Sequence, residues 1–318
     1  MSAEAVKVQS AQPQGAKAEK PKAKIDAVKL KKYGGRYTIG IFRWLFIIGI
    51  CFVILYPLIS KICSSFFSIQ DMYDPTVHYI PKNPTFDNYE TALARLGYPT
   101  TLINTFTLSL LAGILQTASA TLVGYGFARY KFKGRSFLFA LVIIALVAPP
   151  YALLLPRFVM FSNIGLLNTY IPTILMGVTG TGLKCSLYIF IMRQFFRGMP
   201  KELEEAAYVD GAGPVRTFIV IMLPSAVSMM VTCFLFSFVW QWLDTMYAQT
   251  FMADVRTIAT SIGYLRDTAG QGLVADTQLG ADLIKNAGIV IIILPLLVLY
   301  AFTQRFFVES IARSGLVG

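Results

Sequence analysis

Long runs of apolar residues recur along this chain. Six of them come close to the roughly 20 residues that a helix needs to cross the hydrocarbon core of a bilayer. They lie at residues 39–60, 101–125, 137–155, 170–192, 218–240 and 286–306. The third and fourth runs are interrupted by prolines and glycines, which are tolerated at membrane depth where neighbouring helices or a cavity satisfy the freed backbone groups. The pattern predicts an all-α polytopic membrane protein with six transmembrane helices.

The composition agrees with a membrane protein. Of the 318 residues, 55% are hydrophobic and only 14% are charged, whereas a soluble domain carries about 25% charged residues. The mean hydropathy is +0.60. Four cysteines are too few for a secreted disulfide scaffold. One lone histidine provides neither a histidine metal site nor a Ser/His/Asp constellation. We therefore expect no metal and no catalytic residue.

The charges predict the orientation of the chain. Lys and Arg total 28 against 17 Asp and Glu, a net charge of +11. With the N-terminus inside, 20 of the 28 basic residues fall on the cytosolic side and 7 on the other, and Lys184 lies within a span. This asymmetry satisfies the positive-inside rule. Both termini are predicted to be cytoplasmic.

Outside the spans, three segments stand out. Residues 1–36 are rich in Ala, Lys, Gln and Pro and are predicted to form a flexible basic cytosolic tail, either solvated or bound to anionic lipid. The remainder, residues 37–318, is predicted to be the transmembrane domain. Two external loops, 61–100 and 241–285, are long enough to be functional or simply solvated. The second holds five aspartates, which would suit a docking partner: Asp244, Asp254, Asp267, Asp276 and Asp282.

The loop between the fourth and fifth spans, residues 196–217, carries a distinct pattern. Pro200 suits the first turn of a helix, and three glutamates follow at the positive end of that helix. Gly211 and Gly213 end it, and Pro214 begins the next element. The loop is predicted to form a short cytosolic helix with Leu203, Ala206 and Ala207 on one face, a glycine break and a second helix. From the residues alone it could equally pack on its own protein.

The motif itself spans this loop and the fifth span. Its spacing is Glu205-Ala206-Ala207, three residues, Gly211, nine residues, Ile221, one residue, then Leu223-Pro224. This spacing resembles the EAA signature of membrane subunits of bacterial ATP-binding-cassette importers. Further matching runs lie at 104–131, 166–169, 193–196, 210–213 and 304–318. The resemblance covers residues 37–318 and is closest to the six-span partner of maltose-importer-type sugar permeases.

The resemblance implies a division of labour. The chain would pair with a homologous second permease subunit in the bacterial inner membrane, and an external solute-binding protein would deliver the sugar. Two cytosolic ATPase subunits would bind ATP and Mg, so the chain itself would be no enzyme and would hold no cofactor. The residues agree, because no G-x-x-x-x-G-K-[ST] phosphate loop is present. Nothing suggests a nucleic-acid partner.

The resemblance also assigns sites. Residues implied to couple to the ATPase are Glu204, Glu205, Ala206, Ala207, Asp210, Gly211, Leu223 and Pro224. The C-terminus from Gln304 to Gly318 would reach the ATPase, and residues near 245–275 would touch the binding protein.

Polar and aromatic residues in the spans are candidates for the substrate path. They are Asn104, Gln116, Lys184, Trp240, Gln241 and Trp242. An intramembrane charge marks a functional site by default, but lysine can also snorkel to an interface. Amides can instead join helices, and tryptophans can form the interfacial belt.

The function expected is therefore a permease subunit of an ATP-driven oligosaccharide or glycoside importer. One alternative keeps the mechanism and changes the cargo to another small polar solute. A gradient-driven secondary transporter would need intramembrane carboxylates, and a membrane enzyme would need catalytic side chains; the spans offer neither.

Overall fold

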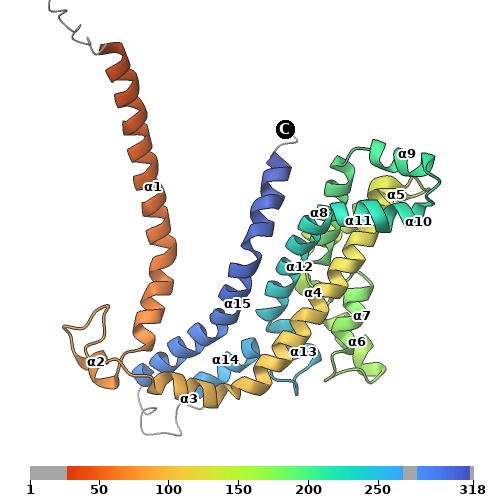
Figure 1. Ribbon diagram of the computed structural model, residues 1–318. Coiled ribbons are helices and arrows are strands. Elements are labelled where there is room, and N and C mark those ends of the chain that lie inside the picture. Colours follow the sequence, from red (N-terminus) through yellow and green to blue (C-terminus); the bar gives the residue numbers. More distant parts are fainter. Residues whose placement is uncertain (1–26, 268–277, 316–318) are drawn as a thin grey trace, which may run out of the picture. The chain divides into compact units, whose positions relative to one another are not determined.

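The computed structural model describes residues 27–267 and 278–315 (Figure 1). In these ranges every regular element is a helix, which confirms the all-α prediction. The chain divides into two compact units, Met1–Pro57 and Leu58–Gly318.

The first described helix is α1, Ala27–Ser65. Its stretch Gly40–Ser65 is long and apolar enough to cross a membrane, as predicted for the first span. Apolar side chains along it, such as Phe42 and Trp44, are exposed. The helix begins within the segment predicted as a flexible tail, where Ala, Lys and Leu favour helix. Residues 1–26 of that tail lie outside the described part.

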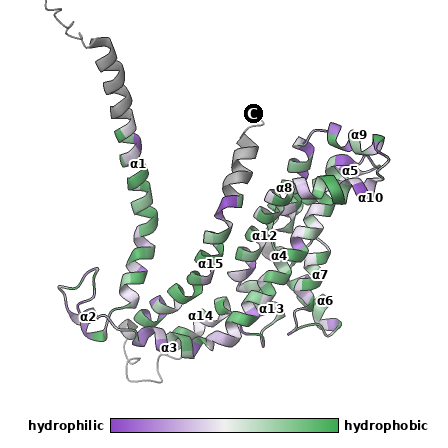
Figure 2. Ribbon diagram, viewed as in Figure 1, coloured by the Kyte–Doolittle hydropathy of each residue, from purple (hydrophilic) through white to green (hydrophobic). Residues whose placement is uncertain are grey.

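Two more uninterrupted helices could span a membrane by length and composition. They are α4, Tyr98–Arg129, and α15, Gln278–Gly315, at the second and sixth predicted spans. Figure 2 shows long apolar stretches along both. Two further candidates are bent pairs: Arg135–Val147 with Tyr151–Asn163, at 98°, and Pro214–Ser225 with Val227–Trp242, at 73°. The described residues thus hold three candidate spans, or five if each bent pair is one.

The fourth predicted span is not a single helix. It consists of α7, Ile171–Val178, and α8, Cys185–Gly198, which are separated by a turn. Within that turn Gly180 and Lys184 adopt left-handed φ angles of 69° and 61°, which a continuing right-handed helix cannot contain. Six continuous spans are therefore not confirmed among the described residues.

Helix α4 is the centre of the second unit and packs against α7, α8 and α12 (Val227–Trp242). At Gly124 it approaches α8 so closely that a Cβ atom there would lie 2.7 Å from the Met192 Cβ and 2.9 Å from the Arg193 backbone nitrogen. Small residues permit this approach between membrane helices. The contact positions the end of α4 on which the candidate site is built.

We expect Gly124→Val to destabilise the protein by about 1–3 kcal/mol, as overpacking at a helix contact does. Gly126→Ala is the matched control, because a Cβ atom at Gly126 meets nothing within 4 Å. Thermal unfolding of the solubilised protein should show a lower Tm for Gly124→Val only. Equal Tm values for the two variants would contradict the close packing.

Short helices cap both ends of this bundle. The helices α9 (Glu202–Val209), α10 (Pro214–Thr217) and α11 (Leu223–Ser225) lie near the Arg129 end of α4 (Figure 1). Near its other end lie α3 (Asp87–Leu96) and α14 (Ile258–Asp267), and the Thr105 hydroxyl accepts the backbone N–H of Ile258 at 2.8 Å. The remaining elements are α2 (Ile69–Tyr73), α5 (Arg135–Val147), η1 (Pro150–Leu153), α6 (Leu154–Asn163), η2 (Phe218–Met222) and α13 (Met246–Phe251).

The predicted acidic surface of residues 241–285 is smaller than expected. Asp244 is buried, and its carboxylate accepts the backbone N–H groups of Tyr247 and Ala248 at 3.3 and 3.0 Å, which caps α13. Burial raises the pKa of this carboxyl group above its usual value. Asp254 and Asp282 are exposed. The Asp267 side chain and all of Asp276 lie outside the described part.

Candidate functional site

The predicted short helix is present as α9. Three glutamates occupy its first turn, where they favour the positive end of the helix dipole. It ends at Asp210, and Gly211 follows with φ +79°. The backbone N–H of Ala212 donates to the Ala207 carbonyl at 2.9 Å, which closes the helix end. The glycine break and the second helix beginning at Pro214 are confirmed.

The residues of α9 differ in burial. Of its eight residues only Glu204 and Ala207 are buried. Leu203 and Ala206, which share a face with Ala207 by their spacing, are exposed, as are Glu205 and Val209. The helix therefore turns one glutamate and one alanine inward, and presents Glu205, Ala206 and Val209 to the outside.

The inward Glu204 is held by the end of α4. The Tyr125 hydroxyl donates to Glu204 Oε1 at 2.8 Å, and Arg129 Nε lies 3.3 Å from Glu204 Oε2. Arg129 Nη2 also donates to the Met199 carbonyl at 2.9 Å, on the connection between α8 and α9. Only 7% of the Arg129 and 11% of the Glu204 side chain is exposed. We call Tyr125, Arg129, Glu204 and the Met199 carbonyl the α4–α9 clasp.

Sequence reasoning missed two members of this clasp, Tyr125 and Arg129. The available signal was their spacing: four residues apart, they share a face of α4 at its basic end. The sequence could not show that the Glu204 side chain points inward. Three glutamates lie in the first turn of α9, and which of them faces the bundle depends on how the helix packs against it.

Leu223 and Pro224 lie where the segment after α9 bends. The preceding five residues, Phe218–Met222, form a π-helix. Pro224 lacks the N–H that would donate to the carbonyl four residues earlier in an α-helix, so regular α-helical bonding is interrupted here. The 73° bend follows between Pro214–Ser225 and Val227–Trp242. The Leu-Pro pair therefore marks the corner between the α9–α10 segment and the fifth predicted span.

Lys184 and Trp240 are brought together. Lys184 sits in the break between α7 and α8 with a left-handed backbone, a strained conformation that concentrates at functional positions. Its Nζ lies 5.0 Å from the centroid of the Trp240 ring, within reach of a cation–π interaction. Trp240 is 47% exposed. In this pair an ammonium group and an accessible aromatic face lie side by side.

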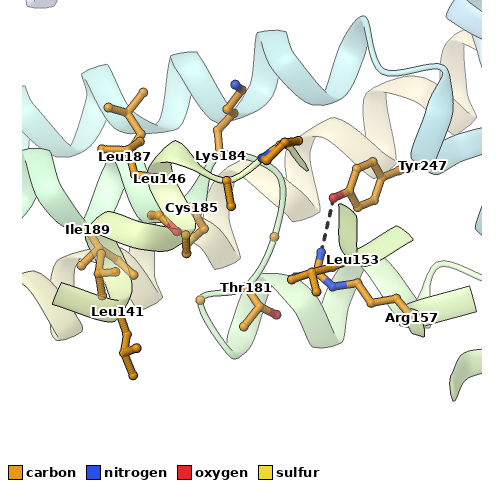
Figure 3. A pocket seen from close by; sticks show the side chains of 17 residues that line it. Leu141, Leu146, Leu153, Arg157, Thr181, Lys184, Cys185, Leu187, Ile189 and Tyr247 are labelled. Carbon is orange, nitrogen blue, oxygen red and sulfur yellow. Dashed lines mark hydrogen bonds between the residues drawn. The ribbon is translucent and has the colours of Figure 1, made fainter. Parts of the chain in front are cut away.

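A cavity of about 330 Å³ adjoins this pair. Its lining includes the end of α5, residues 180–182 and 184–187, Arg157 and Tyr247; of the pair, Lys184 is a lining residue and Trp240 is not. Figure 3 shows the Arg157 side chain reaching Tyr247, to whose hydroxyl it donates at 3.3 Å, while the Lys184 amine points away from both. The lining is mostly apolar with a few polar groups, the usual character of a small-molecule site.

The other residues predicted to lie along the substrate path are buried or bonded within the chain. Gln116 is buried against Gly182, where a Cβ atom would lie 2.6 Å from Nε2. Gln241 and Trp242 are buried, and Trp242 stacks on Phe238 at 5.6 Å. Asn104 joins two segments, accepting from the Tyr170 hydroxyl and donating to the Arg256 carbonyl, both at 3.0 Å. Gln116, Trp242 and Asn104 thus make contacts within the chain, and a place in the substrate path stays a prediction for all four residues.

Two further predictions concern the C-terminus and metals. Gln304 is exposed and its Nε2 donates to the Ala301 carbonyl at 3.2 Å, whereas Gly318 lies outside the described residues. Within the described part of the chain, no group of three or more His, Cys, Asp or Glu residues is placed to hold a metal ion.

The helical arrangement defines a polytopic membrane permease fold. A crystal structure of a bacterial ABC transporter involved in the import of the acidic polysaccharide alginate matches it with a TM-score of 0.70, at 20% identity, covering 86% of this chain and 98% of that one. Residues 120–313 match the family model of the binding-protein-dependent transport system inner membrane component. The chain belongs to this family of ATP-binding-cassette importer permeases, multi-pass proteins of the inner membrane whose ATP is hydrolysed by a separate ATPase component.

Several relatives are similar over nearly their whole length. The arabinooligosaccharides transport system permease protein AraQ of Halalkalibacterium halodurans is 30% identical, covering 89% of this chain and 99% of that protein. The maltodextrin permease MalD of Streptococcus pneumoniae is 28% identical, covering 91% and 98%. The galactooligosaccharides permease GanQ of Bacillus subtilis is 26% identical, covering 89% and 97%.

Proposed function

We propose that this chain is the six-span permease subunit of an ATP-driven, binding-protein-dependent importer of oligosaccharides or glycosides. The observation that carries the mechanism is α9: a glycine-terminated helix that presents Glu205, Ala206 and Val209 outward at one end of the bundle. A protruding face with exposed side chains is what a helix needs to enter a cleft on a partner. The names of the relatives, which refer to three kinds of oligosaccharide, support the cargo class.

The proposed assembly contains four further parts. A homologous second permease encloses the translocation path with this chain, and two cytosolic ATPases close on ATP. The outward face of α9 sits on one ATPase, with Gly211 and the Leu223-Pro224 corner setting its geometry and the C-terminal residues 304–318 lying nearby. An external binding protein docks near residues 245–275, around α13 and α14. ATPase closure then tilts the spans from inward-open to outward-open.

The assembly implies that α9 is cytosolic, together with both termini and the tail at residues 1–36. The basic residues near α9, including Arg197, Lys201 and Arg216, support this orientation through the positive-inside rule. We expect a cysteine introduced by Lys201→Cys to react with a membrane-impermeant maleimide in inverted vesicles but not in intact cells. Labelling in intact cells would overturn the orientation.

Within the path, we assign Lys184 and Trp240 to substrate contact. An exposed indole face can stack on a sugar ring, and the adjacent ammonium group can donate hydrogen bonds to hydroxyls. We expect Trp240→Ala to raise the apparent KM for uptake roughly tenfold, equivalent to about 1.4 kcal/mol of binding. Trp44→Ala, at an exposed tryptophan of α1, is the control and should leave KM unchanged. An unchanged KM in Trp240→Ala would remove the pair from the path.

The decisive experiment is reconstitution. The complex purified through a tag on this chain is placed in proteoliposomes, and its ATP hydrolysis is measured with the binding protein across a panel of saccharides and small polar non-sugar solutes. Stimulation by oligosaccharides is the expected result. Stimulation by non-sugar solutes alone would overturn the cargo class. Uptake by this chain alone, driven by a proton or sodium gradient, would overturn the mechanism.

A further inference from the structure

Polar contacts of the Glu204 carboxylate attach α9 to the rest of the bundle. An isolated helix of eight residues is not stable in water, so α9 is held by contacts. Its two inward residues are Glu204 and Ala207, and burying a methyl group contributes only about 0.8 kcal/mol. The α4–α9 clasp is therefore the main side-chain attachment of α9 to the bundle.

The clasp is also more than a single contact. One carboxylate binds two side chains of α4, with a separate oxygen for each. Arg129 in turn holds the Met199 carbonyl, which precedes α9 in the chain. A single contact leaves a helix free to pivot, whereas contacts at separate points resist rotation as well as separation.

The α4 side of the clasp is anchored in the bundle. The Tyr125 ring lies 5.3 Å from the Phe196 ring of α8 and 4.6 Å from the Phe218 ring of η2. Both Tyr125 and Phe196 are buried. The residue immediately before Tyr125, Gly124, packs directly on α8. A displacement applied at Glu204 therefore reaches the packed core of the bundle through Tyr125.

From this geometry we infer that the α4–α9 clasp, through Tyr125, Glu204 and Arg129, transmits movement of α9 to α4. This rests on the proposed function, because it gives α9 the role of receiving movement from the ATPase. Glu204 is then a positioning residue that faces this chain, while Glu205 faces the ATPase. The two adjacent glutamates have opposite partners and separate tasks.

The test measures whether α9 and α4 move together. A keto amino acid is placed at the exposed positions 114 in α4 and 208 in α9 and coupled to nitroxide labels, so that partner cysteines stay unlabelled. Position 208 is not part of the outward face formed by Glu205, Ala206 and Val209. The complex is isolated through a tag on this chain, and the label separation is measured by pulsed EPR without nucleotide and after trapping with Mg-ATP and vanadate. The wild-type separation should be the same in both states.

Two clasp variants and a control complete the design. Tyr125→Phe removes one hydroxyl and keeps the ring packing, and Glu204→Ala removes the carboxylate. In both variants, the distribution of distances between the labels in the trapped state should be shifted or broadened. The control is Glu202→Ala, which truncates an exposed glutamate of the same helix and should show a smaller change. If Glu204→Ala does not assemble, Tyr125→Phe alone decides the question.

The outcomes separate the two proposals. The inferred role of the clasp would be contradicted if the distance between the labels changed on trapping in the wild-type complex. It would also be contradicted if the clasp variants kept this distance constant. In both cases the complex would still hydrolyse ATP. If the wild-type complex neither retains an ATPase nor hydrolyses ATP, the proposed function is wrong, and so is the role of the clasp that depends on it.

Discussion

Glu205→Lys is expected to reduce uptake at least about tenfold while the protein remains in the membrane at its normal level. Glu205 lies on the outward face of α9, so reversal of its charge acts on the proposed ATPase contact and leaves the α4–α9 clasp intact. Loss of a charged partner at an interface costs on the order of 2 kcal/mol or more. Uptake and the amount of co-purified ATPase are the measurements.

Glu90→Lys is the matched control for this change. Glu90 and Glu205 are both exposed glutamates in the first turn of a helix, so both substitutions oppose a helix dipole by about 0.3–1 kcal/mol. Glu90 lies in α3, near the opposite end of the bundle from α9, and should leave uptake unchanged. Normal transport by Glu205→Lys with the ATPase still bound would contradict the assignment of the outward face.

Gly211→Val is expected to abolish uptake for a conformational reason. Gly211 has φ +79°, and the left-handed region costs an ordinary residue roughly 1–2 kcal/mol and a β-branched one more. No neighbouring atom lies within 4 Å of a Cβ atom built there, so the effect comes from the backbone and not from a clash. Uptake by cells that contain normal amounts of the protein is the measurement.

Gly211→Asn distinguishes backbone conformation from side-chain size. Asparagine tolerates the left-handed conformation much better than valine does, so this variant should keep most of the uptake. Loss of uptake in both variants would show that the space around Gly211 matters, as it would inside a partner's cleft. Wild-type uptake by Gly211→Val would remove this turn from the coupling mechanism.

The elements that the sequence predicted well are those fixed by local chemistry. The start of α9 after Pro200, its end at Asp210 and the left-handed glycine that follows depend on residues within a few positions of one another. The long apolar runs behind α4 and α15 likewise need only their own hydropathy. Each of these signals is complete within one short window of the chain.

The predictions that the structure does not confirm depend on residues distant in the chain. Hydropathy counted residues 170–192 as one span, but three glycines and a left-handed Lys184 break the helix where Gln116 of α4 fills the space. Trp242 was a candidate for the path together with Trp240, yet Trp242 is buried and Trp240 is exposed. A helix places residues two positions apart about 200° apart, so closeness along the chain says little about a shared face.

The sequence by itself determined that this is an all-helical membrane protein and that it carries the signature of an importer permease, because hydropathy, charge asymmetry and motif spacing are properties of the chain. Tertiary structure alone decided that Glu204 turns inward to Tyr125 and Arg129 while Glu205 stays outside. The physical reason is that a buried carboxylate must find its partners wherever the fold brings them, here 79 positions away from Tyr125 along the chain.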